Sequence, residues 1–136
     1  PQDVVDRMLE IAEVGPDDRL IDLGSGDGRI VIGAAKRGAR ATGIEIDPEL
    51  VEQSRANVEQ AGVQGKAEIR SANIFETDLS QATVITMYLL PSLNMKLRPR
   101  LLELEPGTRI VSHAFDMQDW KADRREDAAG RAIHLW

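Results

Sequence analysis

The sequence predicts an α/β fold, a doubly wound and mostly parallel sheet with helices on both of its faces. Short apolar runs of strand length alternate along the chain with segments whose apolar residues recur at helical spacing. A glycine-rich turn follows the first predicted strand, at the kind of position where open sheets of this class bind ligands. Parallel strands joined by helical crossovers satisfy this alternation most simply.

The bulk composition bounds the class of protein. At 136 residues the chain is long enough for one domain with a buried core, so we expect residues 1–136 to form a single domain. No apolar run approaches the length of a membrane span. The chain has no cysteine, which excludes disulfides and thiolate metal sites and fits a cytoplasmic protein. The net charge of -6 argues against a general nucleic-acid footprint, but leaves open a local one or a basic protein partner.

The first half of the chain contains clear start and stop signals for each element. Gly15 and Pro16 end the first helix, and Gly38 ends the second. Asp47 suits the N-cap of the third helix and Pro48 suits its first position. The predicted elements are, in order, a helix over residues 4–12, a strand over 19–23, a helix over 30–36, a strand over 39–46 and a helix over 48–62.

The second half is predicted from shorter signals. Strands are expected over residues 66–71, 83–87 and 108–114, a helix over 91–104 and a terminal strand over 133–136. Residues 72–82 are near the lower limit for a parallel crossover, so we expect only turns or one helical turn there. Pro99 should kink or split its helix.

Only six strands can be counted in the whole chain. We therefore expect the sheet to lack or truncate its last strand, with residues 116–130 forming a polar connection. The chain starts at Pro1 and stops inside a strand, and we expect it to be a fragment.

The glycine-rich turn carries the main functional signal. Asp22-Leu23-Gly24-Ser25-Gly26-Asp27-Gly28 lies where the first strand passes into a helix, so backbone N–H groups and a helix N-terminus face a ligand. Glycines at alternate positions allow a tight turn and a close approach of the ligand to the backbone. Glu45 ends the second strand about twenty residues on, where a carboxylate can accept hydrogen bonds from ribose hydroxyls.

Two cofactor classes use this layout, and the residues favour one of them. A dinucleotide fingerprint requires glycine at position 29, where this chain has Arg29. A carboxylate at Asp22 would repel a pyrophosphate, but it would attract the ammonium of a methionine moiety directly or through water. A sulfonium is also cationic. The pattern therefore predicts S-adenosyl-L-methionine as the cofactor.

The phrase from Asp22 to Gly28 resembles motif I of class I S-adenosylmethionine-dependent methyltransferases, which have a Rossmann-like fold. The longer phrase DLGSGDGRIVI, the stretch YLLP at residues 88–91 and the late Trp120 resemble the prokaryotic relatives of the ATP synthase c-subunit lysine N-methyltransferase family. This resemblance implies a methyltransferase domain and a cofactor site. The implied cofactor-binding residues are Asp22, Gly24, Ser25, Gly26, Asp27, Gly28 and Glu45, with Ile46 against the adenine and Asn73 as a polar partner of its amino group.

Purely structural roles remain open as alternatives for several of these residues. Asp27 can be a helix cap, Arg29 a solvated residue of the first helical turn, and Asn73 an ordinary turn former. His113 and His134 lie in strand-like segments and form no metal-ligand pattern, so no metal is expected.

Methyl transfer is an in-line displacement, which needs alignment and exclusion of water rather than a catalytic triad. The resemblance implies a lysine amine of a protein as the acceptor. Tyr88 at the end of the fourth strand would then orient the amine, although a packed aromatic is an equal alternative. His113, Phe115, Asp116 and Trp120 could form the opposite wall of the acceptor site, whereas Phe115 and Trp120 could instead be core residues.

Several functions remain open at this point. Methyl transfer to a small molecule or to nucleic acid would use the same cofactor site, whereas Arg29 counts against a nucleotide-dependent oxidoreductase. A cofactor-binding module without activity is a further alternative. The sequence does not indicate an oligomeric state.

Overall fold

A computed structural model describes residues 2–87, 91–113, 124–128 and 131–135 of the chain. The elements are α1 (Gln2–Ile11), β1 (Arg19–Leu23), α2 (Arg29–Lys36), β2 (Arg40–Glu45), α3 (Pro48–Gln60), β3 (Ala67–Ser71), β4 (Val84–Met87), α4 (Pro91–Leu102), β5 (Arg109–His113), β6 (Arg124–Ala128) and β7 (Arg131–Leu135). Their alternation confirms the predicted α/β class. α4 continues through Pro99 as one helix, so the predicted split does not occur.

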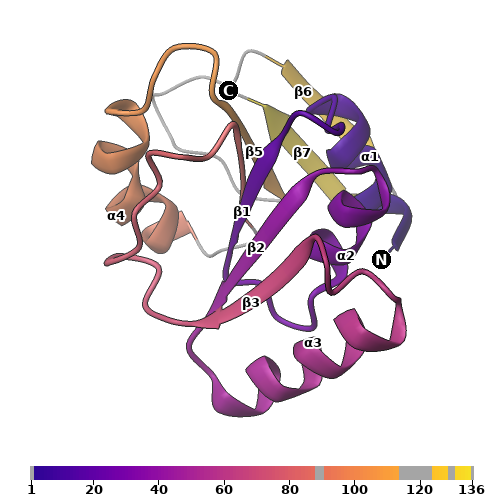
Figure 1. Ribbon diagram of the computed structural model, residues 1–136. Coiled ribbons are helices and arrows are strands. Elements are labelled where there is room, and N and C mark those ends of the chain that lie inside the picture. Colours follow the sequence, from indigo (N-terminus) through magenta and orange to yellow (C-terminus); the bar gives the residue numbers. More distant parts are fainter. Residues whose placement is uncertain (1, 88–90, 114–123, 129–130, 136) are drawn as a thin grey trace.

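One mixed sheet runs through the molecule, with strand order β3-β2-β1-β4-β5-β7-β6 (Figure 1). The strands from β1 to β5 pair in parallel, and β7 pairs antiparallel to both β5 and β6. The described sheet has seven strands, so the expectation of at most six, with the last one missing or truncated, was wrong. The missed strand is β6, which lies within the segment expected to be a polar connection. Its sequence RREDA has no apolar alternation, and an edge strand does not require any.

Two hydrophobic clusters cover opposite faces of the parallel strands. In β1, Leu20 belongs to the cluster formed with α1, α2 and α3, whereas Leu23 belongs to the cluster formed with α4. β4 is buried on both faces, because all four of its residues are buried. Figure 1 shows the resulting layers, with α1 and α2 on one side of the sheet and α4 on the other. Within the described ranges, no helix is both long and apolar enough to cross a membrane.

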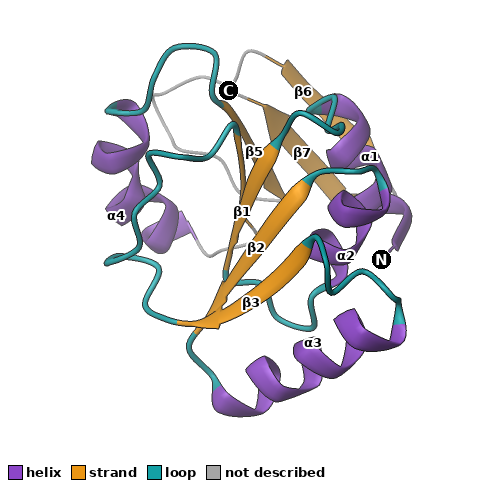
Figure 2. Cartoon of the chain, in the orientation of Figure 1, coloured by secondary structure: helices purple, strands orange, loops and turns teal. Residues whose placement is uncertain are grey.

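The connection from β3 to β4 consists of turns and loop without a helix, as Figure 2 shows and as its length predicts. Its apolar residues Leu79 and Ala82 are buried in the α4-side cluster. The segment therefore covers part of the sheet with side chains but supplies no helical layer over β2 and β3.

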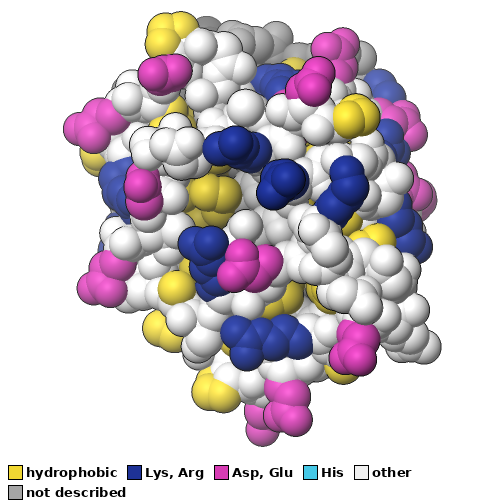
Figure 3. Space-filling model, viewed as in Figure 1, with side chains coloured by type: hydrophobic (Ala, Val, Ile, Leu, Met, Phe, Trp, Pro, Cys, Tyr) yellow, Lys and Arg dark blue, Asp and Glu magenta, His cyan; other side chains and the backbone are white. Residues whose placement is uncertain are grey.

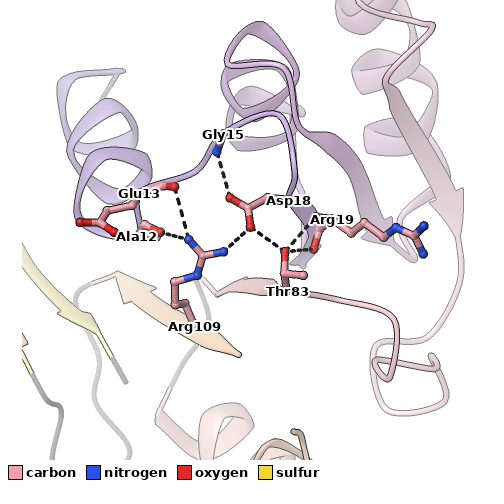
Figure 4. A network of polar contacts seen from close by, with 7 residues as sticks. All are labelled: Ala12, Glu13, Gly15, Asp18, Arg19, Thr83 and Arg109. Atoms are coloured by element: carbon pink, nitrogen blue, oxygen red, sulfur yellow. Dashed lines mark hydrogen bonds and ion pairs between the residues drawn. The ribbon is translucent and has the colours of Figure 1, made fainter. Parts of the chain in front are cut away.

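A polar network ties the starts of β1, β4 and β5 together at the amino-terminal edge of the sheet (Figure 4). The carboxylate of Asp18 accepts hydrogen bonds from the backbone N–H of Gly15 (2.9 Å), the hydroxyl of Thr83 (2.8 Å) and the guanidinium of Arg109. Arg109 also donates to the carbonyl of Ala12 at 2.6 Å, at the end of α1. This edge is cross-linked by residues far apart in sequence.

Candidate functional site

The glycine-rich turn lies at the opposite, carboxyl-terminal edge of the parallel strands. Gly24, Gly26 and Gly28 have φ angles of 77°, 56° and 88°, in the left-handed region where only glycine is free of strain. The backbone N–H groups of Gly24 and Ser25 both donate to the carbonyl of Ile44, at 2.9 and 3.0 Å. The turn is therefore anchored to the end of β2, as the predicted motif requires.

Two close approaches support the turn from beneath, and neither of them was predicted from the sequence. A Cβ added to Gly43 of β2 would lie 2.6 Å from the Cβ of Ser25, so only glycine lets the turn pack onto the strand. Gly28 lies against α3, where an added Cβ would meet the Cβ of Ser54 at 3.2 Å. The side chain of Asn57 in α3 donates to the carbonyl of Asp27 at 2.9 Å. An isolated glycine inside a strand pattern was the only signal for Gly43 in the sequence.

Asp22 is the buried acid of the site, with 1% of its surface exposed. The hydroxyl of Thr86, its neighbour across the β1–β4 pairing, donates to its carboxylate at 2.8 Å. Burial raises the pKa of Asp22 to about 7, and the negative charges of Glu45 and Asp27 add to this, while the Thr86 hydrogen bond opposes it. The described residues provide no cation to neutralise Asp22. The buried hydroxyl of Ser25, in the same turn, also has no hydrogen-bond partner among them.

Glu45 closes the site from the end of β2. One carboxylate oxygen accepts the backbone N–H of Gly26 at 2.9 Å, and the other accepts those of Ile46 and Asp47 at 3.0 and 3.1 Å. A carboxylate has about four acceptor positions, so one remains free on the oxygen that faces Gly26. A diol that binds through both hydroxyls therefore needs the carboxylate to release one of its present donors.

Asp27 and Arg29 interact with each other at the start of α2. The carboxylate of Asp27 accepts the backbone N–H of Arg29, the first residue of α2, at 3.1 Å. The exposed guanidinium of Arg29 forms an ion pair with the same carboxylate at 3.0 Å. The N-cap position itself is Gly28, which offers no side chain.

A cavity of about 430 Å³ opens beside the turn, between the ends of β2 and β3. It is lined by Gly24, Ile44, Glu45, Ile46, Ala72, Asn73, Ile74 and Phe75. Ile46 is 66% exposed and Phe75 is 36% exposed, so two apolar side chains face the solvent at its rim. Larger hollows of about 750 and 680 Å³ lie elsewhere on the surface, and neither is lined by Glu45 or Asn73.

Asn73 has the contacts of a turn former and also lines the cavity. Its side-chain oxygen accepts the backbone N–H of Phe75 at 2.8 Å, and its carbonyl accepts the hydroxyl of Thr77 at 2.8 Å. The amide nitrogen keeps its donors free for a ligand within the described structure. Both interpretations of Asn73 are therefore compatible with its position.

The remaining predicted residues lie outside what the structure describes. Tyr88, Phe115, Asp116 and Trp120 fall on residues that are not described. For His113 and His134, only the backbone places them, in β5 and in its partner strand β7. In the described part of the chain, no group of acidic and histidine side chains is arranged to hold a metal ion.

The residues of the site fit a cationic ligand that also carries a ribose. A turn of left-handed glycines allows close approach, and an added Cβ at Gly26 would meet no atom within 4 Å, so space is open above the turn. Below it lies Asp22, a buried acid without a cation, and beside it Glu45 has one acceptor position unused. Because a pyrophosphate would add negative charge to this acidic site, the chemistry favours an ammonium and a sulfonium.

Comparison with known proteins agrees with this arrangement. The sequence profile of the ANTKMT methyltransferase domain matches residues 22–124. The chain is 52% identical over 123 residues to a protein-lysine N-methyltransferase of Saccharolobus islandicus, covering 88% of this chain and 76% of that protein. It is 39% identical over 105 residues to the mouse ATP synthase c-subunit lysine N-methyltransferase, covering 76% of this chain and 42% of the mouse protein.

Among solved structures, an RNA methyltransferase from Salinibacter ruber, in complex with S-adenosyl-L-homocysteine, has a TM-score of 0.97 and 56% sequence identity. The match covers 100% of this chain and 90% of that one. The glycine turn with its paired acids, the sheet order and these matches agree on one assignment. The chain belongs to the ANTKMT methyltransferase domain family, and it is a class I, S-adenosylmethionine-dependent methyltransferase.

Proposed function

We propose that this chain transfers the methyl group of S-adenosylmethionine to a lysine side chain of a protein. The observation that carries this proposal is the Saccharolobus islandicus relative, which is 52% identical across 88% of the chain and is named a protein-lysine N-methyltransferase. The name of the mouse relative also specifies a lysine, although the chain spans only 42% of that protein.

Most of the predicted binding residues have a proposed role in this reaction. The cofactor supplies an electrophilic methyl group on a cationic sulfur. Asp22 would attract its ammonium, Glu45 would accept from its ribose, and the glycines from Gly24 to Gly28 would let the backbone approach it. Ile46 and Asn73 line the cavity beside Glu45, which supports their proposed place against the adenine.

The acceptor lysine must reach the site without its proton. Its ordinary pKa is about 10.4, so the amine has to be desolvated or deprotonated before it can attack. Tyr88 follows β4, next to the strand that carries Asp22, and we propose that it positions the amine. A Tyr88→Phe variant tests the hydroxyl, because loss of a positioning group lowers kcat while cofactor affinity stays unchanged.

Methyl transfer to RNA is a second candidate, because the Salinibacter ruber relative is named an RNA methyltransferase. The net charge of -6 disfavours it, since a polyanion is repelled at long range. A binding surface for RNA would have to be a local basic area of the protein.

The test is transfer of radiolabelled methyl groups into a cell extract, followed by digestion with ribonuclease or with protease. We expect the label to survive ribonuclease, to be lost with protease, and to appear as methyl-lysine after acid hydrolysis. An Asp22→Ala variant should transfer no label, while Asp17→Ala, which removes an exposed acid away from the cavity, should transfer it normally. Label that disappears with ribonuclease would overturn the lysine proposal and favour RNA.

A further inference from the structure

On the α4 side of the sheet, β3 and the amino-terminal ends of β1 and β2 lack a helical cover. α4 packs through Leu97 and Leu101 into the cluster that contains Leu23 of β1, Ile44 of β2 and residues of β4 and β5. The β3–β4 connection contains no helix, and Glu68 and Arg70 of β3 stay exposed. Parallel strands are almost always covered on both faces, so exposed side chains in this part of the sheet are unusual.

Basic side chains gather on this open face. Figure 3 shows several Lys and Arg side chains around a hollow over β1, β2 and β3. The hollow has a volume of about 680 Å³ and lies between the sheet and the β3–β4 connection. Its lining includes Arg19, Arg40, Lys66 and Arg70, although the chain as a whole has six more acidic than basic residues. We name these four residues the basic row.

Three cations of the basic row are adjacent across the strands. Arg19 and Arg40 are direct partners in the β1–β2 register. Lys66 precedes β3, and its carbonyl accepts the backbone N–H of Ala41, which places it beside Arg40. Like charges directly opposite one another destabilise a sheet, so this arrangement has a cost in the free chain.

No acid of the described chain neutralises these three side chains. Arg19 donates to the amide oxygen of Gln81 at 3.3 Å, and Lys66 donates to the carbonyl of Gly38 at 3.0 Å, which are both neutral acceptors. The Arg40 guanidinium has no hydrogen-bond or ion-pair partner among the described residues. Only Arg70 has an acidic partner, Glu68, in an exposed pair at 3.3 Å.

We infer that the basic row is a docking surface for an acidic segment of a partner protein. The floor of the hollow includes the partly buried Ile21 and the buried Ala82, which offer an apolar contact between the cations. An extended acidic peptide laid across the strands would present carboxylates to more than one cation of the row.

A nucleic acid fits this surface less well. Single strands usually stack their bases on aromatic side chains, and none of the described residues that line the hollow is aromatic. Arg19, Arg40 and Lys66 lie at the amino-terminal ends of their strands, opposite the edge that carries the glycine turn. The inference therefore does not depend on the identity of the methyl acceptor.

The test compares two charge reversals that change the net charge equally. Arg40→Glu lies in the basic row, whereas Lys36→Glu lies in the last turn of α2 on the other side of the sheet. The probe is a fluorescein-labelled oligo-glutamate peptide, and binding is followed by fluorescence anisotropy at low and at physiological salt. We expect Arg40→Glu to weaken binding by about fivefold or more and Lys36→Glu by less than about twofold. Affinity for S-adenosylhomocysteine should stay the same in both variants.

Equal losses in the two variants would overturn the inference, because binding would then report only net charge. If oligouridylate binds more tightly than the peptide and this binding is lost in Arg40→Glu, the ligand of this surface is a nucleic acid and not an acidic peptide. If the wild type sediments as a dimer and Arg40→Glu sediments as a monomer, the partner at this surface is a second copy of the chain. Arg40→Glu places an acid opposite Arg19, so its melting temperature should not fall. If it does fall, Arg40→Gln serves in its place and should weaken peptide binding more than Lys36→Gln.

Discussion

Asp18 and Asp22 lie at the two ends of β1, and each accepts a hydrogen bond of 2.8 Å from a threonine of the neighbouring strand region, Thr83 and Thr86. Both carboxylates are buried. Their surroundings nevertheless shift their pKa values in opposite directions. The difference lies in the other groups that surround each acid.

Burial alone would raise the pKa of Asp18, but hydrogen bonds from Gly15 and Thr83 and the charge of Arg109 outweigh it and lower the pKa. Asp22 has the Thr86 hydrogen bond but no cation, so burial dominates and raises its pKa to about 7. At the amino-terminal edge of the sheet, the charge of Asp18 is therefore balanced by Arg109. At the carboxyl-terminal edge, the charge of Asp22 has no such partner and is left for a cationic ligand to balance. The same residue type stabilises the fold at one edge and prepares a binding site at the other.

The largest expected effect on stability comes from disrupting the Asp18–Arg109 network at the amino-terminal edge of the sheet. Arg109→Gln removes the cation beside Asp18 and the donor to the carbonyl of Ala12. Because the buried carboxylate of Asp18 then loses its charged partner, we expect the free energy of unfolding to fall by about 2–3 kcal/mol in urea denaturation. Glu10→Gln is the control, since it removes only the exposed Arg7–Glu10 pair and should cost less than about 0.5 kcal/mol. Equal costs would show that the Asp18 network contributes no more than a surface pair.

A second prediction concerns how stability depends on pH. The pKa of Asp22 is raised from 3.8 in the unfolded chain to about 7 in the native state. Between these values the native state holds a proton that the unfolded state has lost, so this group lowers stability as pH rises through that window.

Asp22→Asn removes this pH-dependent contribution. The amide does not titrate, so any effect it has on the free energy of unfolding is the same at every pH. We therefore expect the unfolding free energy of the variant, relative to wild type, to increase from about pH 4 to pH 7 and then to level off. Urea denaturation at a series of pH values measures this difference. A difference that does not change with pH would contradict the raised pKa.

The third prediction concerns cofactor affinity. Glu45→Ala removes the acceptor of the Gly26 N–H and the acceptor proposed for the ribose. Calorimetric titration should show at least about tenfold weaker binding of S-adenosylhomocysteine, or about 1.4 kcal/mol. Glu49→Ala, which removes an exposed acid from the first turn of α3, is the matched control. If Glu45→Ala binds S-adenosylhomocysteine as tightly as wild type, Glu45 is not part of the cofactor site.

The smallest effect is expected at Asn73. Its side chain holds the turn after β3 by accepting the backbone N–H of Phe75, and the residue lines the cavity. Asn73→Ala should weaken S-adenosylhomocysteine by about threefold, and Asn73→Asp, which keeps the turn contact, should separate the two roles. If Asn73→Asp binds as well as wild type, the residue serves the turn alone.

The sequence was informative where the signal is local. The glycine turn, the Asp47 cap and the helical and strand periodicities each depend on residues near one another in the chain, and β1 was predicted with its observed bounds. The predicted residues Gly24, Glu45, Ile46 and Asn73 line one cavity.

What escaped prediction depends on long-range pairing. Arg109 and Asp18 are 91 positions apart, and Thr86 and Asp22 are 64 apart, so no periodicity links them. The fit of Ser25 over Gly43 arises only when β2 lies under the turn. β6 escaped because a charged edge strand lacks the apolar alternation by which strands are found.

The claim that Asp22 awaits a cation is tested most directly by titrating S-adenosylhomocysteine calorimetrically between about pH 5.5 and 7.5. The wild-type affinity should rise with pH as Asp22 ionises, because the ammonium attracts only the charged carboxylate. Asp22→Asn should bind weakly and show no such rise. If wild type and Asp22→Asn bind with the same affinity at every pH, Asp22 does not take part in cofactor binding and the contrast with Asp18 has no functional meaning.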